Sequence, residues 1–163
     1  MNKFSFLSLI LGATFMSPAA FAAVDPEVSY ILNTLLFLIG GFLVMWMAAG
    51  FAMLESGLVT SKSVATIAAK NIGLYSIAGL MFWFIGYNLA YGIPEGGFIG
   101  TLLPWSDASS IETGYSDGSD WFFQMVFCAT TCSIVSGTMA ERIKIWPFFL
   151  FCAILAGVIY PIA

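Results

Sequence analysis

The stretch Trp121–Arg142, WFFQMVFCATTCSIVSGTMAER, decides the fold class of this chain. Its first twenty residues carry no charge, and about 20 residues at a rise of 1.5 Å each are enough for a helix to cross a bilayer. Small residues dominate the second half, and Ala129, Ser133 and Gly137 recur every four positions. We therefore predict a membrane helix with a smooth ridge, against which a neighbouring helix packs closely.

Two phenyl rings mark the first half of the same stretch. Phe123 and Phe127 lie four residues apart, so they share one face of the predicted helix, one turn above the other. The negative π-faces of such rings can bind a small cation, with contacts worth roughly 0.5–2 kcal/mol each. A ring across a narrow passage can also exclude hydrated ions by its bulk and dryness. The alternative is that both rings simply face lipid or another helix, since the chain has 16 phenylalanines.

The composition indicates a membrane protein. The chain of 163 residues is 60% hydrophobic and 9% charged, whereas soluble domains are about 45–50% apolar and about 25% charged. Residues 1–22 are predicted to be a secretory signal peptide, with Lys3 before an apolar core and Ala20-Phe21-Ala22 as the cleavage pattern. An uncleaved first anchor is the alternative reading of that segment.

Four uncharged stretches follow and predict one all-α, polytopic transmembrane domain over residues 23–163. The predicted spans cover about residues 28–54, 71–93, 121–140 and 145–163. Helices are the expected spanning form, because nothing alternates between apolar and polar residues as a barrel strand must. Glu55 and Glu141 close the first and third spans, where each charge is expected to reach water.

Charge placement predicts the orientation. The basic residues after position 22 are Lys62 and Lys70, between the first two spans, and Arg142 and Lys144, between the last two. Basic residues stay in the cytoplasm, so we predict an outside N-terminus and an outside loop 94–120. That loop is acidic, with a short helix expected around 102–109, and its charge either enriches cations at an outer vestibule or is ordinary solvation.

The residue inventory disfavours catalysis. The chain has no histidine, no predicted acid or base deep within a span and no phosphate loop. Cys128, Cys132 and Cys152 fall inside spans and are expected to be small packing residues and not metal ligands. We therefore predict no enzyme, no cofactor, no metal site and no nucleic-acid partner.

Three segments together resemble the ammonium transporter family (the Amt/Mep/Rh proteins). They are GFAMLESGLVTSK (Gly50–Lys62), KNIGLYSIAGLMFWFIGYNLAYG (Lys70–Gly92) and FQMVFCATTCSIVSGTMAERIKIWPF (Phe123–Phe148). The resemblance covers about residues 28–163. It implies the first four helices of an eleven-helix bundle with an inverted repeat, assembled as a homotrimer in the cytoplasmic (inner) membrane.

The same resemblance implies a function and site residues. Ammonium, or methylammonium, would be recruited at an outer aromatic site, and ammonia would cross a hydrophobic pore. Phe127 matches the gate phenylalanine, Phe123 the ring that helps to wall the recruitment site, and Gln124 a position near that site.

Other parts of the family pattern are missing from these 163 residues. The outer tryptophan, the buried aspartate of the fifth helix, the twin histidines and the second gate phenylalanine would all come later. The chain is therefore expected to be an N-terminal part that does not conduct alone. Two alternatives stay open: a membrane-embedded ammonium sensor or interaction module without conduction, and a polytopic anchor unrelated to ammonium.

Overall fold

The computed structural model describes residues 25–163, and the predicted signal peptide lies outside them. Four helices in this range are long and apolar enough to cross a membrane. They run up and down as neighbours, with α5 (Asp117–Met139) lying between α2 (Pro26–Leu58) and the other two spans. The predicted all-α, four-span architecture is confirmed.

The second and fourth spans each combine α-helical and π-helical turns. The second consists of α3 (Val64–Met81), η1 (Phe82–Gly86) and α4 (Tyr87–Tyr91), and the fourth of α6 (Ile145–Ile154), η3 (Leu155–Ile159) and α7 (Tyr160–Ile162). The two π-helical segments pack against each other, and a Cβ on Gly86 would lie only 2.9 Å from the carbonyl oxygen of Ala156. Glycine therefore allows the two backbones to approach.

The core forms where α5 meets its neighbours, through small side chains. Cys128 and Cys132 are fully buried, and their sulfur atoms lie 3.6 and 4.0 Å from the carbonyl oxygens of Ala156 and Cys152. Of the predicted ridge, Ala129 and Ser133 are buried, whereas Gly137 is exposed. The packing ridge of α5 is therefore rotated slightly from the predicted one. It is shifted toward the buried row one residue earlier along the helix, which consists of Cys128, Cys132 and Ser136.

Several sequence predictions need correction. The helix of the second span begins at Val64, before the predicted start at Asn71, so that Lys70 lies within α3. Residues 102–110 contain no helix; the loop instead has a single 3-10 turn, η2 (Ile111–Thr113). The backbone of this segment makes hydrogen bonds to neighbouring elements, and the Trp105 N–H donates to the carbonyl oxygen of Trp83 at 2.8 Å. A local helix is therefore not formed.

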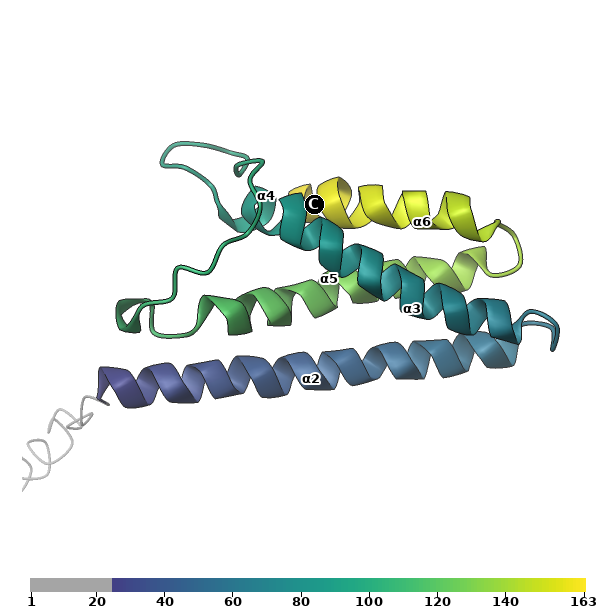
Figure 1. Ribbon diagram of the computed structural model, residues 1–163, viewed down its shortest axis with the longest axis horizontal. Helices are drawn as coiled ribbons and strands as arrows, with labels where there is room; N and C mark the ends of the chain where they lie inside the picture. The colour runs from purple at the N-terminus through teal and green to yellow at the C-terminus, as the bar shows by residue number, and fades with distance from the viewer. Residues whose placement is uncertain (1–24) are drawn as a thin grey trace, which may run out of the picture.

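The bundle has two chemically different ends. At one, which we call the aromatic end, α5 begins, α4 ends and the long loop 92–116 crosses over; at the other, the ion-pair end, the two short loops 59–63 and 140–144 lie side by side (Figure 1). Hydrogen bonds hold the loops in place at both ends. At the aromatic end, Asn33 donates to the carbonyl oxygen of Gly114 at 2.9 Å, and at the ion-pair end the Thr60 hydroxyl donates to Glu141 at 2.6 Å.

Candidate functional site

The ring pair lies at the aromatic end, on the side of α5 that meets α2. Phe123 and Phe127 contact each other edge to face, with centroids 5.1 Å apart and planes at 75°. Phe123 also packs on Phe37 of α2, with centroids 5.4 Å apart. A Cβ on Gly40 would lie 2.7 Å from Cε2 of Phe123, so the absence of a side chain there makes room for the ring.

The two rings differ in exposure. Phe123 is half-buried, whereas 38% of Phe127 is exposed. Phe127, the ring farther from the aromatic end, thus has a surface that the described residues leave partly uncovered. An aromatic face in a water-poor setting is suited to hold a small cation or to close a narrow passage.

Gln124 lies beside the rings on α5 but bonds in another direction. Its side-chain oxygen accepts a hydrogen bond from the Tyr91 hydroxyl at 2.9 Å, and its nitrogen contacts Asp120 Oδ1 at 3.4 Å. The Tyr87 hydroxyl donates to Oδ2 of the same carboxylate at 2.6 Å. The structure therefore places Gln124 in a polar network with α4, while the rings of Phe123 and Phe127 pair with each other.

Asp120 is a functional candidate that sequence reasoning missed. The sequence predicts an acidic surface loop up to residue 120, yet Asp120 lies in the first turn of α5 and is only 8% exposed. A signal was present in the sequence: Asp120, Phe123, Gln124 and Phe127 follow the spacing i, i+3, i+4 and i+7 of one helix face.

The ion-pair end holds charge of a different kind. Glu55, which was predicted to reach water, is instead 2% exposed, and its Oε2 lies 3.3 Å from Nζ of Lys70. Asn71 donates to the same oxygen at 3.0 Å, and Lys70 donates to the carbonyl oxygen of Ser136 at 3.0 Å. Glu55 and Lys70 are buried although each lies near one end of its helix, because α3 begins earlier than expected and α5 covers the pair.

Glu141 connects the two loops at this end. Its carboxylate accepts hydrogen bonds from the hydroxyl and the backbone N–H of Thr60, at 2.6 and 3.0 Å. These bonds, with a further one from Ser63, hold the pKa of Glu141 below its ordinary value. Its backbone is left-handed, with φ of 61°, which is uncommon for a residue other than glycine.

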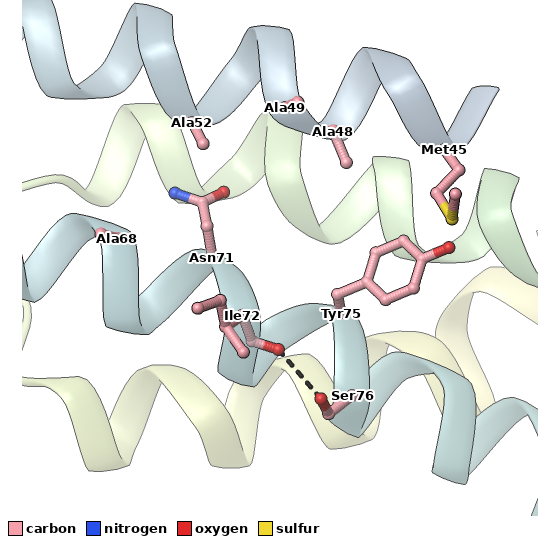
Figure 2. A pocket seen from close by; sticks show the side chains of 9 residues that line it. All are labelled: Met45, Ala48, Ala49, Ala52, Ala68, Asn71, Ile72, Tyr75 and Ser76. Carbon is pink, nitrogen blue, oxygen red and sulfur yellow. Dashed lines mark hydrogen bonds between the residues drawn. The ribbon is translucent and has the colours of Figure 1, made fainter. Parts of the chain in front are cut away.

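An open groove of about 450 Å³ separates α2 from α3. Figure 2 shows three alanines of α2 on one wall, with Asn71 and Tyr75 of α3 reaching across from the other. The lining carries no charged side chain and lies apart from the ring pair. The candidate site is therefore the ring pair and not this groove.

Potential metal ligands are scattered in the described part of the chain. Between residues 25 and 163, no group of three or more histidine, cysteine, aspartate or glutamate residues is arranged to hold a metal ion. The three cysteines are free and buried, which fits small packing residues.

Comparison with known proteins gives a consistent result. The model of the "Ammonium Transporter Family" matches residues 35–163. The chain is 42% identical over 131 residues to "Ammonium transporter Amt2" of Archaeoglobus fulgidus, covering 77% of this chain and 26% of that protein. It is 38% identical over 125 residues to "Ammonium transporter Amt2" of Methanocaldococcus jannaschii, covering 75% and 29%.

A solved structure shares the fold. The structure titled "Sensor Amt Protein" superimposes with a TM-score of 0.75 at 29% identity, over 85% of this chain and 34% of that one. The chain thus spans 26–34% of the length of these relatives. A family described as transporters agrees with the prediction that the chain is not an enzyme. On the family match and the shared fold together, this multi-pass membrane chain belongs to the ammonium transporter family.

Proposed function

We propose that this chain forms the outer recruitment site and the first gate of a protein that moves ammonium, as ammonia, across the cytoplasmic membrane. The observation that carries the proposal is the ring pair of Phe123 and Phe127 at the aromatic end of α5. Phe123, held between Phe37 and Gly40, walls the recruitment site. Phe127, the more exposed ring, closes the passage one turn further inward.

The polar network supports recruitment of a cation next to these rings. Ammonium offers four N–H donors, and the oxygen of Gln124 and the hydroxyl of Tyr91 are acceptors at the same end of α5. Methylammonium retains three N–H donors and is a second expected substrate. A hydrophobic ring beyond the acceptors favours passage of the neutral molecule over the hydrated ion.

We further propose that the aromatic end faces outward. Lys62, Arg142 and Lys144 all lie in the two short loops of the ion-pair end, and basic residues remain on the cytoplasmic side. The acidic loop 92–116 then lies outside, at the same end of the bundle as the site.

The proposed assembly is a homotrimer. The support from the structure is the large apolar surface of α2, in which Gly41 and Glu55 are the buried residues. Such a helix needs lipid or further protein as a neighbour. Native mass spectrometry of the full-length protein in detergent tests this part, and a monomer or dimer as the only species would contradict it.

Substitution of Phe127 tests the transport proposal. In the full-length protein, Phe127→Ala removes the ring that closes the passage and should change the rate of methylammonium uptake, because the bulk and dryness of that ring no longer select the neutral molecule. Phe98→Ala is the matched control, because that ring is 98% exposed in the outer loop. Unchanged uptake in Phe127→Ala would contradict the gate assignment.

Sensing without conduction is the second candidate, favoured by the likeness to the structure titled "Sensor Amt Protein". Both functions need the recruitment site, and only transport needs a flux. Uptake of labelled methylammonium into proteoliposomes decides between them: a saturable flux supports transport, whereas binding without flux supports the sensor.

A further inference from the structure

We propose that Asp120 is a positioning residue that supplies the negative charge of the outer site, and this inference rests on the proposed function. Asp120 does not need to touch the substrate. Its carboxylate attracts the cation toward α5 and orients Gln124, the neighbouring polar group.

Burial and hydrogen bonding fix the carboxylate in place. Asp120 is 8% exposed, and its two oxygens face the Tyr87 hydroxyl and the Gln124 amide at 2.6 and 3.4 Å. The ring of Tyr87 is itself held edge-on by Phe82 and Trp105, with centroids 5.9 and 6.4 Å away. The carboxylate is therefore part of a rigid network and not a freely rotating surface group.

No basic residue neutralises this charge in the part of the chain that the structure describes. The ion pair found between residues 25 and 163 joins Lys70 to Glu55, and Lys62, Arg142 and Lys144 also lie at the ion-pair end. Both hydrogen-bond partners of Asp120 are neutral. Asp120 also lies in the first turn of α5, where the unpaired N–H groups of a helix N-terminus carry partial positive charge. Among the described residues, no basic side chain therefore compensates this carboxylate.

Asp120 precedes the ring pair along α5, at the aromatic end of the bundle. Phe123 and Gln124 follow it by three and four residues and Phe127 by seven, so all four lie on one face. A cation that approaches the rings from the aromatic end passes the carboxylate one turn earlier. Walls of low dielectric around the rings strengthen this attraction relative to open water.

The full-length protein carrying Asp120→Asn tests the inference. The amide keeps the shape but removes the charge, so the half-saturating concentration of methylammonium should rise about tenfold and become less sensitive to ionic strength, with little change in maximal rate. Asp120→Glu should restore much of the affinity. Glu112→Gln, which removes one charge from the exposed η2 turn, is the matched control and should leave uptake unchanged.

Each other outcome overturns the inference in a recognisable way. An unchanged half-saturating concentration in Asp120→Asn shows that the charge has no role. A fall in maximal rate or thermal stability alone shows a purely structural residue, and equal effects of Glu112→Gln show a general surface charge. A wild-type protein that neither takes up nor binds methylammonium overturns the proposed function together with this inference, whereas normal wild-type uptake with an indifferent Asp120→Asn overturns the inference only.

Discussion

Each end of this helix bundle buries a carboxylate, and the two carboxylates have opposite surroundings. Glu55 is paired with Lys70 and further bonded by Asn71, so its charge is compensated inside the protein. Asp120 has only the neutral partners Tyr87 and Gln124 among the described residues. Glu55 and Lys70 therefore form a charge pair that holds helices together, whereas we propose that the charge of Asp120 is available to a passing cation.

The compensated pair should show the largest effect on stability. Lys70→Met leaves Glu55 buried without its cation, which should cost about 3–5 kcal/mol and reduce the amount of folded full-length protein. Thermal denaturation in detergent measures this. Lys62→Met, at an exposed lysine in the adjacent loop, is the control and should have little effect.

The double variant Glu55→Leu, Lys70→Met sharpens the same comparison. Replacement of a buried ion pair by apolar residues is often neutral, so the double variant should be more stable than Lys70→Met alone. If it is equally unstable, the pair does not act as a compensated unit, and the contrast with Asp120 loses its basis.

A smaller effect is expected where α2 supports the ring pair. Gly40→Ala places a methyl group against the Phe123 ring, which must move, so the affinity for methylammonium should fall severalfold with a stability loss of about 1 kcal/mol. Gly50→Ala on the same helix has no atom within 4 Å and should be neutral or slightly stabilising. Equal affinities in the two variants would show that the position of Phe123 does not matter for recruitment.

The smallest effect belongs to the exposed carboxylate of the ion-pair end. The Thr60 hydrogen bonds lower the pKa of Glu141, so the ionised form contributes stability above the ordinary pKa of glutamate, and this contribution is lost as the pH falls through the lowered value. Glu141→Gln should therefore melt slightly below wild type at neutral pH, with a difference that disappears in acid. A difference that grows in acid would contradict this assignment.

The spans and the ring pair could be predicted from the sequence, since both depend on local spacing. An uncharged run of twenty residues is long enough for a membrane span, whatever its neighbours are. A four-residue interval likewise places Phe123 and Phe127 on the same face of a helix. The partners of Glu55 and Asp120 could not be predicted in this way. Lys70 and Tyr87 reach them from another helix, and those contacts follow from how α3 and α4 cross α2 and α5.

The loop 92–116 escaped prediction for a related reason. Its residues bond to helix ends far away in sequence, as Gly114 does to Asn33 and Leu103 to Asn88. Local propensity therefore gives little indication of its path, and the helix expected around 102–109 does not form.

Cysteine labelling from outside the cell tests the central claim most directly. In the full-length protein with its native cysteines replaced, Gln124→Cys should react with a membrane-impermeant thiol reagent added to intact cells, and ammonium should slow the reaction. Labelling only after permeabilisation, or a rate indifferent to ammonium, would contradict an outward recruitment site at the start of α5.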